Sequence, residues 1–582
     1  MWKQVTNPLN NIYLSSMVAV IPILFIFWAL IIKKMKGHIA SFLTAIVAII
    51  LAILVYKMPV QLALISACNG AIYGLFPICW IIITVIFLFN ITVKSGQFEV
   101  IKNFIASITP DRRIQALLIA FSFGAFLEGT AGFGAPVAIS AAMLAGLGFS
   151  PIYAAGICLI ANTVPVAFAA AGIPITVAAQ VSGLPEMDVS MLVGRTLTVL
   201  SLLIPFYLII MMAGFKKTIE IWPAILVSGG SFALLQFLAS NFLGPALPAI
   251  IGGLGSIICL FIFLKFWKPK KIWSFNNENT PQSISAHSYS ARQLLKAWSP
   301  FILLTIMIIA WGLAPIRQLL DTTTLSFKIP GLDGIIVDSE GKILSKIFKF
   351  NYLSAAGTSI FIASILAIPL GGLSAKEGIK IFGETLKQLK YPIIIVASIL
   401  GFAFVANDSG ITITMANGLA GTGKLFPFFA PLLGWLGTFI TGSDTSSNAL
   451  FSKLQTATAQ SIGVDPLFTV SGNAVGGVVG KMMSPQSVAV ATASVGLAGQ
   501  ESSLFRFTAK HSVIILTFIC LFVYVQTYWL KGILPKSSSI KSGLATSGNS
   551  SGGILYLASL VVIVTAFWLF VYLSGKKSSN NG

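Results

Sequence analysis

Charged residues are scarce in this chain. Only 9% of its 582 residues are Asp, Glu, Lys or Arg, and 56% are hydrophobic, with a mean hydropathy of +0.91. A soluble domain could not hide that much apolar surface from water. A β-barrel would show weak alternation of polar and apolar residues instead of the long apolar runs found here. The composition therefore predicts an all-α polytopic membrane protein.

Histidine and cysteine are also rare, with three His and five Cys in the chain. So few His residues argue against a His-based metal site. The Cys residues fall singly in or beside apolar runs, without the spacing of a disulfide framework or a metal site. No His/Asp or Cys/His cluster lies in the spans, so an enzyme working inside the membrane lacks its nucleophile and base. We expect no metal, no cofactor and no catalytic residues.

The formal net charge of +20 could suggest a nucleic-acid partner. The Lys and Arg residues sit between apolar spans, however, as the positive-inside rule expects of topology signals. We therefore expect the lipid bilayer, and no nucleic acid, as the surroundings of the chain. Residues 12–32 are long enough to span and are followed by Lys33 and Lys34, so we expect a retained first helix with its N-terminus outside.

Apolar runs predict about 13 transmembrane helices. They fall near 12–32, 38–56, 71–93, 151–170, 188–213, 220–240, 245–267, 296–315, 351–371, 391–407, 466–481, 508–530 and 554–574.

Two further regions are interrupted, namely 114–148 and 425–460. Each arm of the first has about 15 residues, roughly 22 Å of helix, against about 30 Å of hydrocarbon. We therefore predict two re-entrant hairpins. Their tips fall at Glu128 to Gly134 and at Gly442 to Ser446.

The two hairpin regions, roughly 310 residues apart, have the same residues at several equivalent positions. Twelve residues separate Asn162 from Pro174, and the same interval separates Asn473 from Pro485. Further matched pairs are Phe126 and Phe439, Gly129 and Gly442, Ser95-Gly96 and Ser409-Gly410, and Arg195 and Arg506. Paired broken segments in two halves of a chain indicate the central binding site of a transporter.

Threading the spans from an outside N-terminus puts the basic clusters on one side, and the hairpins then enter from opposite sides. This predicts an inverted-topology repeat. Four regions follow: residues 1–267 with the first hairpin, a cytoplasmic linker at 268–295, residues 296–530 with the second hairpin, and a flexible outside loop with an additional helix at 531–582.

Backbone that leaves a helix inside a membrane finds partners only within protein or beside a cavity. The hairpin tips present free N–H groups that suit a carboxylate. We also expect helix breaks near Asn162 and Asn473. The substrate-binding candidates at these places are Gly129, Thr130, Ala131, Gly132, Asn162, Ser443, Thr445, Ser446, Ser447 and Asn473.

Two acids, Glu128 and Asp444, sit at the tips. A charge at mid-bilayer costs about 2.5–3.5 kcal/mol, so each needs a partner, a proton or a task. They are the proton-coupling candidates, and a salt bridge or a wet cavity wall is the structural alternative. The basic candidates for meeting an anionic substrate are Lys453, Lys481, Arg195 and Arg506, with snorkelling or interfacial anchoring as their alternative.

Three long motifs resemble the lactate permease family. They are EGTAGFGAPVAISAAMLAGLGFSP from Glu128 with ANTVPVAFAAAGIP from Ala161, GSDTSSNALF from Gly442, and NAVGGVVGKMMSPQSVAVA from Asn473. The resemblance implies a multi-pass symporter of a bacterial plasma membrane, the inner one in a Gram-negative cell, that takes up lactate or glycolate with protons. It also implies elevator-type motion, because that family is grouped with the ion-transporter superfamily. A homo-oligomer is left open.

Two other functions stay open at this stage. Ser447-Asn448-Ala449 partly matches the Ser-Asn-Thr tips at which relatives in that superfamily bind sodium, so a sodium-coupled carrier of another organic anion is the alternative. A channel would need polar faces repeated along several helices, whereas the polar residues here concentrate in two tips.

Overall fold

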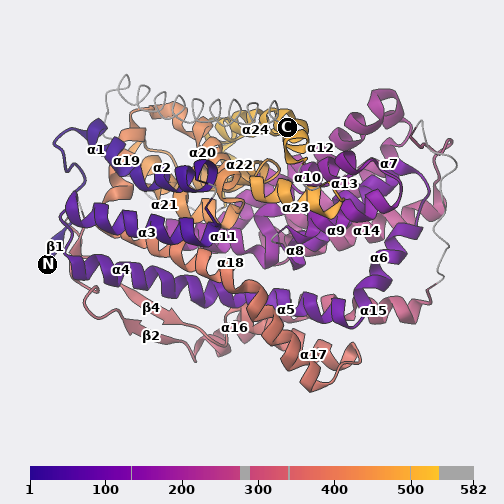
Figure 1. Ribbon diagram of the computed structural model, residues 1–582, viewed down its shortest axis with the longest axis horizontal. Coiled ribbons are helices and arrows are strands. Elements are labelled where there is room, and N and C mark those ends of the chain that lie inside the picture. The colour runs from indigo at the N-terminus through magenta and orange to yellow at the C-terminus, as the bar shows by residue number, and fades with distance from the viewer. Residues whose placement is uncertain (34, 133, 276–288, 339–340, 498–499, 536–582) are drawn as a thin grey trace.

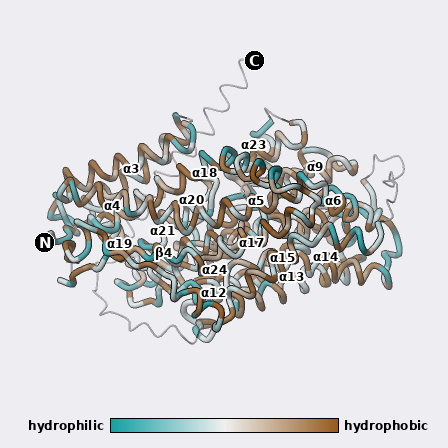
Figure 2. Tube along the Cα trace, turned by 90° about the horizontal axis from the view of Figure 1, so that it is seen from below, coloured by the Kyte–Doolittle hydropathy of each residue, from teal (hydrophilic) through white to brown (hydrophobic). Residues whose placement is uncertain are grey.

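The computed structural model describes residues 1–33, 35–132, 134–275, 289–338, 341–497 and 500–535, which are mostly helical (Figure 1). Part of the predicted linker, and the predicted helix at 554–574 with most of the loop before it, lie outside these residues. Hydrophobic residues, brown in Figure 2, run along the helices throughout the molecule. Many are exposed on the outer helices, including Phe242 and Phe266, as expected of side chains that face lipid.

The N-terminal elements run from a short strand to a pair of helices joined at Gly96. They are β1 (Trp2–Lys3), α1 (Ile12–Ala19), α2 (Ile21–Phe27), η1 (Trp28–Ile32), α3 (Gly37–Leu54), α4 (Val60–Tyr73), η2 (Gly74–Cys79), α5 (Trp80–Lys94) and α6 (Gln97–Ser107). Gly96 has a φ of 75°, a left-handed conformation that glycine adopts without steric cost.

The first interrupted region and the helices after it follow. They are α7 (Arg112–Gln115), η3 (Ala116–Phe123), α8 (Gly124–Thr130), α9 (Ala135–Gly146), α10 (Pro151–Ala161), η4 (Val166–Phe168), α11 (Ala169–Ser182), α12 (Glu186–Ile219), α13 (Trp222–Phe242) and α14 (Pro248–Phe266). The chain turns back between α8 and α9, where Gly132 and Gly134 have φ values of 58° and 86°.

A small β-region interrupts the helices in the middle of the chain. The elements are α15 (Ala291–Gly312), α16 (Ala314–Asp321), β2 (Leu325–Lys328), β3 (Ile336–Val337), β4 (Ile347–Phe350), α17 (Ala356–Leu370) and α18 (Ala375–Ser409). β2 pairs antiparallel with β4, Leu325 opposite Phe350, and β1 pairs parallel with β3. None of these strands was predicted, and β2, β3 and β4 lie between the predicted spans at 296–315 and 351–371.

The C-terminal part contains the second interrupted region. Its elements are α19 (Ile411–Ala420), η5 (Gly423–Leu425), α20 (Phe426–Thr441), α21 (Asp444–Ser461), α22 (Pro466–Lys481), α23 (Pro485–Ser494), α24 (Glu501–Tyr528) and η6 (Lys531–Ile533). Gly410, with a φ of 97°, joins α18 to α19 as Gly96 joins α5 to α6. Gly442, at 73°, joins α20 to α21.

Ten helices among the described residues are long and apolar enough to cross a membrane, and there are 11 if the bent pair of α10 with η4 and α11 counts as one span. The predicted spans at 351–371 and 466–481 correspond to the shorter helices α17 and α22. Both interrupted regions form a helix, a tight turn and a second helix. Their re-entrance into the membrane stays a prediction.

Helices from both halves of the chain pack against each other. α18 lies along α3 and α4, α17 lies along α5, and α21 contacts α11. In the C-terminal half, α20 and α22 approach closely through glycines. A Cβ on Gly476 would lie 1.9 Å from the carbonyl oxygen of Pro431, so only glycine fits there.

Candidate functional site

Three helix ends converge on a buried ion pair. Glu128 stands in the last turn of α8, Lys481 ends α22 and Asp444 begins α21. The Lys481 ammonium donates to Glu128 Oε1, joining the two hairpin regions across 353 residues of chain. Glu128 is fully buried and Lys481 is 8% exposed, so solvent screens their charges little.

Asp444 lies one helical turn from this ion pair. Its Oδ1 occupies the space over Gly477, where an added Cβ would come within 1.9 Å of it, and Gly477 precedes Lys481 by four residues on α22. The charge of Lys481 acts on the Asp444 carboxyl, which also accepts from Thr438 Oγ1 at 3.4 Å. The Lys481 ammonium thus interacts with two buried acids, Glu128 through an ion pair and Asp444 through its charge.

A chain of side-chain amides extends from Asp444 across α21 and α22. Gln455 Nε2 donates to Asn473 Oδ1 at 3.1 Å, and Asn473 Nδ2 donates to Asn448 Oδ1 at 2.9 Å. Asn448 Nδ2 then donates to the carbonyl oxygen of Pro174 at 3.1 Å and to Asp444 Oδ2 at 3.4 Å. Pro174 belongs to α11, so this network links the two halves of the chain a second time.

Several buried oxygens at the helix breaks have no hydrogen-bond partner within the described part of the chain. They are Glu128 Oε2, Asn162 Oδ1 and Thr163 Oγ1. Leaving such groups unpaired costs about 1–3 kcal/mol each, so they are suited to receiving a proton or a ligand.

The break predicted near Asn162 is confirmed, because α10 and the helix after it are bent by 70° just beyond it. The break predicted at Asn473 is wrong. α22 runs from Pro466 through Asn473 to Lys481 without interruption, and the break comes only between α22 and α23. Helix packing against α20 explains the glycines after Asn473 that suggested a break.

The residues of the first tip mostly serve the turn. Gly129 faces Ile250 of α14, where a Cβ would clash at 2.7 Å, and the Thr130 hydroxyl donates back to the carbonyl oxygen of Phe126 in its own helix. Ala131 is fully buried. A Cβ on Gly132 would lie 3.2 Å from Ala170, so this tip touches the start of α11.

Strained backbone lies at that contact. Ala170, Ala171 and Gly172 have φ values of 43°, 56° and 78° in succession. Left-handed conformations cost energy for residues with a Cβ, and strain of this kind gathers at binding and switching sites.

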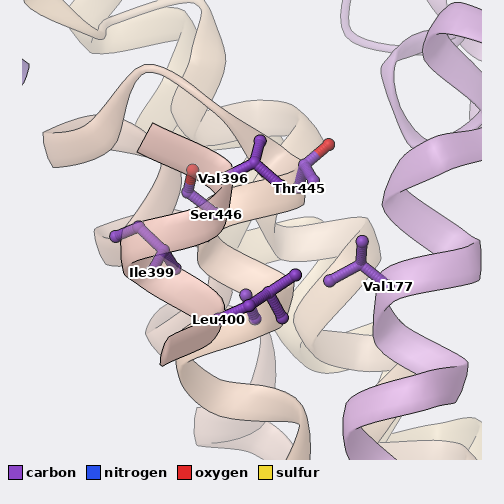
Figure 3. Close-up of a pocket in the computed structure, with 7 residues that line it drawn as sticks. Val177, Val396, Ile399, Leu400, Thr445 and Ser446 are labelled. Carbon is purple, nitrogen blue, oxygen red and sulfur yellow. The ribbon is translucent and has the colours of Figure 1, made fainter. Parts of the chain in front are cut away.

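The hydroxyls of the second tip divide into two groups. Ser443 caps α21 by accepting from the N–H of Ser446, and Ser447 Oγ donates to the carbonyl oxygen of Gly434 in α20. Thr445 and Ser446 instead line a narrow cavity with Val177 of α11 and with α18 (Figure 3). The α18 residues in that cavity are Val396, Ile399 and Leu400.

The other basic candidates lie apart from the ion pair. Arg195 Nε donates to Asn241 at 2.8 Å, and its guanidinium also bonds the carbonyl oxygen of Ile533. Arg506 is exposed on α24. Lys453 is half-buried on α21 and experiences the charges of Lys346 and Asp408.

Sequence reasoning singled out Glu128, Asp444, Lys481 and Asn473 but left Asn448 and Gln455 unassigned. The signal for Asn448 was present in the tip motif at Gly442, where it was weighed only as part of a sodium-site pattern. Nothing in the sequence singles out Gln455, because the sequence does not show whether a polar side chain on a helix points into a buried hydrogen-bond network or towards a loop.

These helices and this buried polar centre define a multi-pass membrane transporter. The model of the L-lactate permease family matches residues 15–530, and the chain belongs to that family. It is a permease and not an enzyme.

Curated relatives agree with this assignment. The chain is 52% identical to an L-lactate permease of Bacillus subtilis (strain 168), over 92% of this chain and 100% of the relative. It is 48% identical to an L-lactate permease of Escherichia coli (strain K12), again over 92% and 100%. A glycolate permease of the same strain is also 48% identical, over 92% of this chain and 99% of the relative.

Proposed function

We propose that this protein imports lactate, and also glycolate, by symport with one proton across a bacterial plasma membrane. The family and the names of its relatives support the substrate class. The observation that carries the mechanism is the buried ion pair between Lys481 and Glu128, with Asp444 beside it.

Protonation of Glu128 is the coupling step. While Glu128 is ionised it occupies the Lys481 ammonium, and a second carboxylate cannot compete for that charge without leaving Glu128 buried and unpaired. A proton on Glu128 neutralises it and frees Lys481 for the carboxylate of the substrate. Substrate therefore binds only after the proton and does not cross alone. A proton without substrate leaves the buried Lys481 ammonium unpaired, and the cost of that charge opposes the crossing of the proton alone.

The charges balance if Asp444 stays protonated. The site then holds Lys481 with Glu128 before binding and Lys481 with the substrate carboxylate afterwards, and it is neutral in both states. A neutral site in a low-dielectric environment avoids the cost of an isolated charge. The same accounting gives one proton per monocarboxylate and no net charge moved.

The 2-hydroxyl group of the substrate meets the oxygens at the bend after α10. Asn162 Oδ1 and Thr163 Oγ1 are buried and lack partners among the described residues, so either can accept from a hydroxyl. A substrate with a 2-hydroxyl group donates to one of these oxygens, whereas a plain monocarboxylate leaves both without a donor. The site therefore favours 2-hydroxy acids.

Alternating access arises from an inverted repeat. The matched positions of Gly96 and Gly410 and the helix–turn–helix of each interrupted region support residues 1–267 and 296–530 as the two repeats. In the elevator motion that we propose, the hairpins move with the site against helices such as α18.

Counterflow in proteoliposomes tests this function. Vesicles loaded with unlabelled L-lactate should transiently concentrate labelled L-lactate from outside, because a carrier exchanges the two across one site. Absence of counterflow with lactate and glycolate would contradict the proposal. Counterflow that requires sodium at constant pH would support sodium coupling, in which a cation balances the second carboxyl of the Glu128, Asp444 and Lys481 cluster.

A further inference from the structure

A second polar cavity lies away from the ion pair, beneath the β-region. Its volume is about 310 Å³. It is lined by Asn69 and Tyr73 of α4, Gln180 of α11, Phe404 of α18, Ser345 and Lys346 just before β4, and Ile347 at the start of β4. Ligand pockets run from about 300 to 1,000 Å³, so this one is sized for a small molecule.

The polar wall of the cavity is built around a buried carboxylate. Asp408, at the end of α18, is 1% exposed and accepts from Lys346 Nζ and from Ser66 Oγ, each at 2.5 Å. Ser66 and Asn69 are one turn apart on α4 and therefore share a face. Asn69 is 4% exposed, and its Oδ1 has no hydrogen-bond partner among the residues that the structure describes.

Positive charge exceeds negative charge at this wall. Lys453 of α21 experiences both Lys346 and Asp408. Asp333 bonds the hydroxyl of Ser345 and the N–H of Lys346, and Lys328 acts on it in turn. Around the buried carboxylate of Asp408, the two ammonium groups of Lys346 and Lys453 thus share one negative charge, which leaves one positive charge for an anion to neutralise.

The cavity connects by helix geometry to the tip of the second hairpin. Gln180 follows Val177 by one turn of α11, and Phe404 follows Leu400 by one turn of α18. Val177 and Leu400 line the narrow cavity that contains Thr445 and Ser446 (Figure 3). The seam between α11 and α18 therefore leads from Lys346 towards Asp444.

We propose that this cavity is a vestibule that binds a small 2-hydroxymonocarboxylate before it reaches the central site. Lys346 binds the carboxylate from the cavity while Lys453 and Ser66 compensate the buried Asp408, and Asn69 Oδ1 accepts from the 2-hydroxyl group. The vestibule raises the local concentration of the anion on the side of the membrane that bears the β-region. The inference rests on the proposed function for the identity of its ligand.

Uptake kinetics of the full-length protein in proteoliposomes test the vestibule. The variant Lys346→Gln removes the ammonium, and Lys453 and Ser66 remain to compensate the buried Asp408. We expect it to raise the KM for L-lactate at least threefold while Vmax is retained, because the central site is intact. Lys349→Gln is the matched control, since Lys349 is an exposed lysine of β4, and it should leave KM unchanged.

Two further measurements separate charge from structure. The KM of the wild type should rise with ionic strength, because salt screens the Lys346 ammonium, and that rise should be smaller in Lys346→Gln, which lacks it. Asn69→Ala should raise the KM for lactate more than the inhibition constant for propionate, which lacks the 2-hydroxyl group.

An unchanged KM in Lys346→Gln would overturn the vestibule, as would a loss of Vmax at constant KM. Wild-type protein that shows no lactate counterflow would instead contradict the proposed function itself. The two failures are therefore distinguishable.

Discussion

Glu128 and Lys481 have different roles in the proposed transport cycle. In the mechanism that we propose, Glu128 is the group that changes protonation, whereas Lys481 keeps its charge and changes partner. Because the two side chains are buried against each other, removing either charge leaves the other one uncompensated. The proposed mechanism therefore predicts different transport defects for their neutral variants.

Glu128→Gln should retain lactate exchange and lose proton-driven accumulation. The amide keeps the shape of the side chain but cannot titrate, so Lys481 is always free to bind the substrate. Counterflow and accumulation under an imposed pH gradient are the two measurements. Full accumulation by this variant would exclude Glu128 from coupling, and Asp444→Asn is then the next variant to test.

Lys481→Gln should lose both exchange and accumulation, by at least tenfold in uptake rate, since no cation remains for the substrate carboxylate. Lys424→Gln is a matched control, because Lys424 is exposed at the start of the second interrupted region. It should transport like the wild type. Normal exchange by Lys481→Gln would rule out Lys481 as the carboxylate ligand.

The elements of the site were partly predictable from the sequence. Short apolar arms around Gly132 and Gly442 predicted the tight turns correctly, because a turn with positive φ needs glycine at that position in the sequence. The pairing of Glu128 with Lys481 was not predictable, since it depends on how helices 353 residues apart pack. The glycines after Asn473 led to the wrong prediction of a helix break, because glycine is as common where two helices pack closely as where a helix breaks.

Close packing of α20 on α22 gives a prediction at the scale of elements. Gly476→Ala should destabilise the protein by about 1–3 kcal/mol, because its Cβ would meet the Pro431 carbonyl and the backbone cannot yield easily. Gly383→Ala should stabilise α18 slightly or leave it unchanged, since no atom lies within 4 Å of its Cβ position. Thermal unfolding in detergent would measure both, and equal shifts would contradict the packing argument.

At the scale of the whole molecule, elevator motion predicts that the hairpin tip moves relative to α18. Ser446→Cys in a Cys-free background is suited to this test, because Ser446 is small and lines the cavity against α18. A membrane-impermeant thiol reagent should label it at a rate that saturating lactate changes, since a ligand shifts the populations of the states it binds. A rate independent of substrate would contradict movement at this tip.

The energetics of the complete cycle follow from its charge balance. One proton carried with one monocarboxylate moves no net charge, so the membrane potential should do no work on uptake. A gradient of one pH unit supplies about 1.36 kcal/mol, which corresponds to roughly tenfold accumulation. Proteoliposomes with either a pH gradient or a potassium diffusion potential separate the two forces. Accumulation driven by the potential alone would mean that additional cations cross with lactate, and the neutral site formed by Lys481, Glu128 and protonated Asp444 would then be wrong.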